Sequence, residues 1–343
     1  MQIGIIGLAQ SGKTTLFEAL TRNDQAKSRR NEVQVGVTDV PDLRVDRLSE
    51  MYKPKKTTYA KIQYVLPARA LSDKEKDQAA LVTAVRSADA LIMVVKNFAA
   101  PGGEPPAPKK DIADLDSELV LTDLIAVEKK LERMEHEAKR GKKADLEEME
   151  LLKRCHEALN ADQALRHHPD LCSPPKLRGY AFLSAKPLLI VVNNDEADAI
   201  LPDLGEIPQK EAVLAVRCRL EQEISQMEPE DAAAFLSEYG LAETAMNLMI
   251  RRSYELLGLM SFFTVGEDEV RAWTIRCGTP ALEAAGAVHS DIQRGFIRAE
   301  VLAYGDLISA GSYAEARKRA TVRLEGKTYE VKDGDIAHFR FNI

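Results

Sequence analysis

Gly7-Leu8-Ala9-Gln10-Ser11-Gly12-Lys13-Thr14 decides the fold, because this stretch fits the spacing G-x-x-x-x-G-K-[S/T]. An apolar run from Met1 to Gly7 leads into it, and the helix-like residues Thr15 to Leu20 follow it. The pattern indicates a buried strand, a glycine-rich loop and a helix. In that order, backbone N–H groups of the loop and the helix N-terminus can surround phosphate groups.

Each part of the loop has a chemical role in this interpretation. Lys13 supplies a cation for the β- and γ-phosphates and is the candidate catalytic residue. Thr14 is the candidate metal ligand, because Mg²⁺ prefers oxygen ligands. The expected nucleotide contacts in the loop are Gly7, Ala9, Gln10, Ser11, Gly12, Lys13, Thr14 and Thr15. The expected ligands are ATP or GTP with Mg²⁺, and the alternative is a glycine-rich turn that binds nothing.

Further apolar runs predict the rest of a parallel sheet. They cover Tyr59–Val65, Ala90–Val95 and Pro187–Val192, and helical stretches separate them. Strands that alternate with helices indicate an α/β domain with helices on both faces of the sheet.

A polar tetrapeptide, Asn193-Asn194-Asp195-Glu196, follows the last of these runs. GTP-binding proteins of this architecture carry N-K-x-D here, and the Asp accepts hydrogen bonds from the guanine N1–H and 2-amino groups. Glu196 is longer by one methylene, and adenine has no 2-amino donor, so the reason to favour guanine is weakened. Asn193 and Glu196 are therefore candidate base contacts, with ATP at least as favoured as GTP. A polar turn that caps the next helix explains the tetrapeptide nearly as well.

A helical hairpin is expected between the second and third of these runs. After the Pro- and Gly-rich stretch 101–108, apolar residues spaced four and three apart form a coiled-coil pattern: Val120, Leu124, Val127, Leu131, Met134 and Ala138. The pattern stops at the basic run 139–143 and resumes less regularly at Leu146, Met149, Leu152, Cys155 and Leu159. We expect an antiparallel hairpin inserted into the sheet domain, with a basic tip that is either a solvated turn or an RNA contact.

The C-terminal part changes to short strands with glycine turns, which predicts a small α+β domain. Its expected strands are Val270–Ile275, Phe296–Leu302, Val322–Leu324, Tyr329–Val331 and His338–Phe341. The expected domains are a discontinuous nucleotide-binding domain (1–110 and 178–260), the hairpin (111–177) and the C-terminal domain (261–343).

Composition excludes several classes of protein. The 343 residues suffice for more than one domain, and the formal charge of −7 argues against a basic protein that coats nucleic acid. No apolar run is long enough to span a membrane, and no targeting signal is visible. The 4 cysteines are widely separated, so we expect neither a zinc site nor a disulfide framework. A cytoplasmic location is expected.

Several segments resemble the YchF or Obg-like ATPase family, and the resemblance covers nearly the whole chain. They are Val35–Pro54, Glu118–Glu132, Phe262–Ile275 and His289–Val301, and Asn193 and Glu196 match the family's N-x-x-E. The resemblance implies a P-loop domain, an inserted coiled-coil hairpin and a C-terminal TGS domain, which is a ubiquitin-like β-grasp module. It implies ATP hydrolysis and association with ribosomes or structured RNA. The candidate phosphate neighbours in that module are Arg298, Arg317, Lys318, Arg319, Arg323 and Lys327.

The chain departs from the family where catalysis is concerned. Leu66-Pro67-Ala68-Arg69 stands where the family carries D-x-x-G, and leucine offers no ligand oxygen while proline fixes the backbone. Arg69 is a candidate replacement contact to the γ-phosphate. We therefore expect weak magnesium binding and slow hydrolysis at most. A GTP-binding protein and a catalytically inactive nucleotide-binding scaffold stay open as alternatives.

Three smaller departures concern the nucleotide itself. The family's first-switch Thr aligns near Arg30, and its loop Asn is Gln10. Its Ser-Ala-Lys base-stacking loop is Arg217-Cys218-Arg219, so the resemblance adds Cys218 to the nucleotide-binding candidates.

Overall fold

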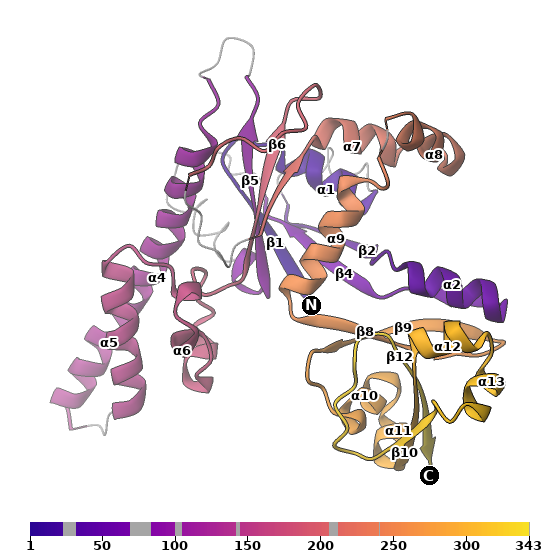
Figure 1. The fold of residues 1–343 in the computed structure, drawn as a ribbon. Coiled ribbons are helices and arrows are strands. Elements are labelled where there is room, and N and C mark those ends of the chain that lie inside the picture. The colour runs from indigo at the N-terminus through magenta and orange to yellow at the C-terminus, as the bar shows by residue number, and fades with distance from the viewer. Residues whose placement is uncertain are drawn as a thin grey trace. The chain divides into compact units, whose positions relative to one another are not determined.

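The computed structural model describes residues 1–22, 32–68, 84–99, 105–141, 145–205, 212–239 and 241–342. The chain divides into two compact units (Figure 1). The first comprises Met1–Val37 and Gln63–Met249, and the second comprises Thr38–Ile62 and Ile250–Ile343. The second unit thus includes an N-terminal segment that the sequence analysis assigned to the nucleotide-binding domain. The other expected domain limits remain a prediction.

The first unit is built on a sheet that has six strands in the described part of the chain, in the order β2-β4-β1-β5-β6-β7. Its strands are β1 (Gln2–Ile6), β2 (Gln34–Asp39), β4 (Lys61–Leu66), β5 (Ala90–Asn97), β6 (Leu188–Asn194) and β7 (Ala212–Val216). The pairs β4–β1, β1–β5, β5–β6 and β6–β7 are parallel. The predicted α/β class with a parallel sheet is therefore confirmed. Consecutive residues of β5 are fully buried, as expected for a parallel strand covered on both faces.

Helices lie on both sides of this sheet, with α4 on one side and α1 and α7 on the other (Figure 1). The helices of this unit are α1 (Lys13–Thr21), α4 (Pro108–Lys139), α5 (Leu146–Asn160), α6 (Pro169–Cys172), α7 (Cys218–Ser225) and α8 (Pro229–Glu238). Helix α9 (Ala245–Leu256) begins in the first unit and continues into the second at Ile250. Two 3-10 helices, Leu165–His167 and Pro175–Tyr180, follow α5. No helix among the described residues is both long enough and apolar enough to cross a membrane.

Helices α4 and α5 form the predicted hairpin and share an apolar cluster around Val127, Leu152 and Cys155. Two residues of the predicted pattern do not contribute to it, because Ala138 is exposed and Leu146 is 77% exposed. Ala138 lies near the end of α4 and Leu146 is the first residue of α5, so both are next to the turn that joins the two helices. The basic tip extends past the described residues, since 142–144 lie outside them.

The second unit contains another sheet, ordered β11-β10-β12-β8-β9-β3 among the described residues. Its strands are β3 (Lys56–Thr58), β8 (Leu259–Val265), β9 (Glu269–Arg276), β10 (Phe296–Ala303), β11 (Arg323–Glu325) and β12 (Asp335–Phe341). Its helices are α2 (Leu43–Tyr52), α10 (Ala281–Val288), α11 (Ser290–Arg294), α12 (Tyr304–Ala310) and α13 (Tyr313–Lys318). The predicted strand Tyr329–Val331 is wrong, because only Glu330 forms an isolated bridge, to Pro280.

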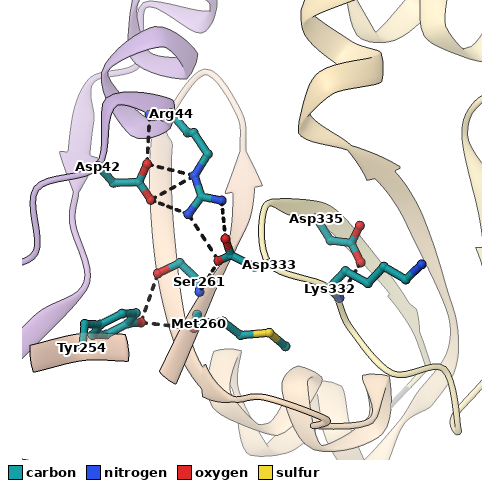
Figure 2. Close-up of polar contacts among 8 residues, drawn as sticks. All are labelled: Asp42, Arg44, Tyr254, Met260, Ser261, Lys332, Asp333 and Asp335. Atoms are coloured by element: carbon teal, nitrogen blue, oxygen red, sulfur yellow. Dashed lines mark hydrogen bonds and ion pairs between the residues drawn. The ribbon is translucent and has the colours of Figure 1, made fainter. Parts of the chain in front are cut away.

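The segment Thr38–Ile62 completes this second sheet. Strand β3 pairs in parallel with β9, and α2 packs on β8 and β9 with Val45 and Leu48 fully buried. Figure 2 shows the Arg44 guanidinium between the carboxylates of Asp42 and Asp333. The C-terminal strands therefore share one core with residues that precede them by about 200 positions.

Candidate functional site

The loop between β1 and α1 has two positions that only glycine can occupy. Gly7 has φ +150°, and a Cβ there would lie 2.3 Å from the Val94 carbonyl oxygen. Gly12 has φ +96°, and a Cβ there would lie 2.2 Å from Nδ2 of Asn193. A Cβ at Gly7 would collide with the backbone, and one at Gly12 would push the Asn193 side chain out of place and strain a backbone with positive φ. The loop thus has the tight curvature that a phosphate-binding loop requires.

Lys13 begins α1 and folds back over the loop. Its Nζ donates to the carbonyl oxygens of Gly7 (2.7 Å) and Leu8 (2.5 Å). Gln10 has φ +61°, a left-handed conformation that costs a non-glycine residue about 1 kcal/mol. This arrangement leaves the ammonium group beside the inner face of the loop, where it can exchange carbonyl partners for an anion.

A cavity of about 890 Å³ opens from this loop. All of the predicted site residues line it: Gly7, Ala9, Gln10, Ser11, Gly12, Lys13, Thr14, Thr15, Asn193, Glu196 and Cys218. The volume is in the range of small-molecule and cofactor sites. The carboxyl ends of β1 and β6 contribute to the cavity, which is where α/β sheets bind ligands. The structure therefore brings the predicted loop residues, Asn193, Glu196 and Cys218 together at one cavity; that they bind a nucleotide remains a proposal.

Asn193 holds three elements together through its side-chain amide. Its Nδ2 donates to the Ser11 carbonyl oxygen at 3.1 Å, and its Oδ1 accepts from the Cys218 backbone N–H at 3.0 Å. The end of β6 is thereby joined to the glycine loop and to the start of α7. The amide of Asn193 thus supports the cavity wall as well as lining it.

Cys218 is fully buried at the start of α7, and this burial raises the pKa of its thiol well above the ordinary value. The thiol therefore stays protonated at neutral pH and serves as a small apolar surface. Next to it, Gln222 donates a hydrogen bond to the buried carboxylate of Glu18 on α1. Both residues line the cavity. The sequence analysis missed Glu18, whose signal is a lone acidic residue within the apolar run Leu16–Leu20 of α1.

The residues present fit a nucleotide better than they fit a metal ion. Thr14, which carries a hydroxyl, lines the cavity, but Leu66 and Pro67, which also line it, offer no side-chain oxygen. No cluster of three His, Cys, Asp or Glu side chains suited to a metal occurs within the described ranges. A magnesium ion here would depend on Thr14, phosphate oxygens and water. The expectations for Arg30 and Arg69 lie outside the described residues.

This strand, glycine loop and helix, with the cavity at the carboxyl end of a parallel sheet, define a P-loop protein of the α/β class. The family model YchF-GTPase_C, described as "Protein of unknown function (DUF933)", matches residues 259–342. The chain is 36% identical to "Ribosome-binding ATPase YchF" of Bacillus subtilis (strain 168) and 35% identical to the protein of that name from Escherichia coli O157:H7. Each alignment covers 99% of this chain and 99% of the relative.

A solved structure shows the same architecture. "Structure of the Schizosaccharomyces pombe YchF GTPase" superposes with a TM-score of 0.86 at 26% sequence identity, and covers 99% of this chain and 97% of that chain. The chain belongs to the YchF family. The resemblance inferred from the sequence segments is thereby confirmed.

Proposed function

We propose that the first unit binds ATP in preference to GTP, together with Mg²⁺, and hydrolyses it slowly at most. The observation that carries this proposal is the backbone at Gly7 and Gly12, where no Cβ fits. A loop so curved, ending at a helix N-terminus and followed by Lys13, has the chemistry of a polyphosphate cradle. The name "Ribosome-binding ATPase YchF" of the bacterial relatives supports ATP as the nucleotide.

Two residues have defined roles in this proposal. Lys13 turns from the carbonyls of Gly7 and Leu8 to the β- and γ-phosphate oxygens and compensates their charge. Thr14 would hold Mg²⁺ through its hydroxyl, and the ion would supply positive charge that compensates the phosphates. Leu66 offers no second protein oxygen for Mg²⁺. In this proposal the site therefore binds phosphate groups but hydrolyses the nucleotide slowly.

Competition between ATP and GTP against a fluorescent nucleotide, with and without Mg²⁺, tests the binding step. We expect Lys13→Ala to weaken ATP binding by about 100-fold, because a charge-assisted contact to two phosphates is lost. Lys129→Ala, at an exposed position of α4, is the matched control and should leave the affinity unchanged. Preference for GTP would overturn the choice of base, and failure to bind either nucleotide would overturn the proposal.

Single-turnover release of phosphate separates the slow enzyme from the alternative, a catalytically inactive scaffold. Slow release that is absent in Lys13→Ala supports hydrolysis by this site. Tight ATP binding without any release supports the scaffold, which the lack of an oxygen on Leu66 favours.

We also infer that the protein associates with ribosomes or structured RNA in the cytoplasm, through the second unit as a TGS-like β-grasp module and through the hairpin. Support comes from the relatives' names and from the exposed Lys139 and Arg140 at the hairpin tip. In the second unit, by contrast, Arg317 and Arg340 pair with the buried Glu300, so these two charges have internal partners.

Cosedimentation with ribosomes tests this inference. The double variant Lys139→Glu/Arg140→Glu should reduce the bound fraction, since reversing charges near phosphate opposes binding. Lys129→Glu/Arg133→Glu, with the same change of charge at exposed positions of the same helix, is the control. Equal loss in both double variants would argue against a contact at the tip.

A further inference from the structure

Arg219 forms an ion pair with Glu196, the residue that the sequence analysis named as a candidate base contact. Arg219 Nε lies 3.0 Å from Oε1 of Glu196 and 3.6 Å from Oε1 of Glu223. Arg217 approaches the same residue from the backbone side, because its Nη1 donates to the Glu196 carbonyl oxygen at 3.5 Å. Glu196 and Arg219 both line the cavity, whereas Glu223 does not belong to its lining. The base side of the cavity therefore presents an ion pair instead of a lone carboxylate.

An ion pair and a lone carboxylate differ in what they offer a purine. A lone carboxylate accepts hydrogen bonds from the N1–H and 2-amino donors of guanine, and adenine has neither donor. A carboxylate that is paired with a guanidinium presents less net negative charge to attract such donors. The ion pair with Arg219 therefore makes the Glu196 carboxylate a weaker acceptor for the N1–H and 2-amino groups of guanine.

We propose that Arg219 is a specificity-determining residue, which disfavours GTP relative to ATP by engaging the carboxylate of Glu196. This inference rests on the proposed nucleotide-binding function and adds to it the residue that sets the base preference. The side chains of Arg219 and Glu196 are 74% and 49% exposed, so the pair is readily broken and its effect is moderate.

The experiment compares GTP and ATP affinities, expressed as a ratio, in the full-length protein. Arg219→Ala frees Glu196 and should raise the GTP:ATP affinity ratio about two- to fivefold, the range that an exposed ion pair supports. The double variant Arg219→Ala/Glu196→Gln should return the ratio to the wild-type value, because the freed carboxylate is gone. Glu223→Gln, which changes the other partner of Arg219, is the control and should leave the ratio unchanged.

Salt provides a second readout that a merely structural role of Arg219 would not produce. Raising the ionic strength from about 0.05 M to about 0.5 M screens the exposed pair, so the wild-type ratio should move towards that of Arg219→Ala. The variant's own ratio should stay constant. Both nucleotides carry the same phosphate charge, so the general effect of salt on phosphate binding cancels in the ratio.

The outcomes separate this inference from the proposed function. If the wild type binds nucleotides and the ratio is the same in Arg219→Ala, the inference fails and the proposed function stands. A ratio that rises equally in the single and double variants also overturns it, because Glu196 would not mediate the effect. If the wild type binds neither nucleotide, both fail together.

Discussion

Arg44 provides the sharpest stability prediction, because one guanidinium joins a helix of the N-terminal segment to the C-terminal strands of the second unit (Figure 2). Its Nη2 lies 2.8 Å from Asp42 Oδ2, and its Nη1 lies 2.6 Å from Asp333 Oδ2. Asp333 in turn accepts from the Ser261 backbone N–H at 3.0 Å. The Arg44 guanidinium also lies 5.1 Å from the centre of the Phe263 ring.

Arg44→Met removes the guanidinium and keeps most of the apolar stem. Loss of one partner costs about 3–5 kcal/mol in a buried ion pair and about 0–1 kcal/mol in an exposed one. The side chains of Arg44, Asp42 and Asp333 are 29%, 15% and 53% exposed, so we expect an intermediate loss of about 2 kcal/mol. For a unit of roughly 100 residues this corresponds to a decrease in Tm of about 10 °C.

The fluorescence of Trp273 measures this unit selectively, because Trp273 is the single tryptophan of the chain and lies in β9. Thermal unfolding followed at this residue should show the decrease in Arg44→Met. Arg47→Met is the matched control on the same helix, since Arg47 is 59% exposed and pairs only with nearby Glu50 among the interactions of the described residues. Equal midpoints in the two variants would refute the argument that Arg44 holds the segment in place.

Three further predictions concern the first unit and the cysteines. Asn193→Ala should weaken nucleotide binding about tenfold, since two buried backbone groups lose partners at about 1 kcal/mol or more each. Calorimetric titration measures this loss, with Lys129→Ala, at an exposed position of α4, as the control. The hydrogen bond from Lys130 lowers the pKa of Glu148, so the pair stabilises the fold above the ordinary carboxyl pKa and loses this effect as pH falls through the lowered value. Glu148→Gln should therefore have a lower Tm than the wild type at pH 7, and the difference should shrink as the pH falls below the ordinary carboxyl pKa; a difference that is constant with pH would contradict the pairing. Alkylation followed by mass spectrometry should modify the exposed Cys172 and Cys277 and spare Cys155 and Cys218, because burial raises the pKa of both protected thiols, that of Cys155 to about 11.

The first unit could be predicted well because its signals are local. The glycine loop and the apolar runs of β5 and β6 each specify their element within a few residues of sequence. The hairpin followed from the spacing of apolar residues along α4, and it failed only at Ala138 and Leu146, where the facing helix ends. The spacing of apolar residues along a helix predicts which side chains are buried only where another helix packs against that face.

The second unit was harder to predict, because its N-terminal segment is defined by distant partners. Strand β3 is a three-residue run, Lys56–Thr58, without apolar alternation, and pairing with β9 alone makes it a strand. The Arg44–Asp333 contact joins residues 289 positions apart, a separation at which no sequence spacing carries information. Strand β8 was also not predicted, although Gly258 and Gly266 flank it, and strands β2 and β7 of the first unit were missed as well.

The same distinction applies within the site. The sequence identified Asn193 and Glu196 by type and position, but their partners come from other loops: the Ser11 carbonyl and Cys218 N–H for Asn193, and Arg219 for Glu196. These partners change the chemistry, since Asn193 becomes a support for the loop and Glu196 becomes half of an ion pair. The type of a residue limits which groups its side chain can bind. Its neighbours in the fold determine which of its donors, acceptors or charges remain available to a ligand.

Affinity and turnover should therefore be separable in this site. Under the proposed function, the curvature at Gly7 and Gly12 and the Asn193 bridge would give the backbone of the phosphate cradle its shape before a ligand binds, which would lower the cost of binding. Efficient phosphoryl transfer also needs positioned charge around the γ-phosphate, and the wall at Leu66 supplies none. Under the proposed function, a nucleotide that both dissociates slowly and is hydrolysed slowly would stay bound for long, so the dissociation rate should be measured beside single-turnover hydrolysis.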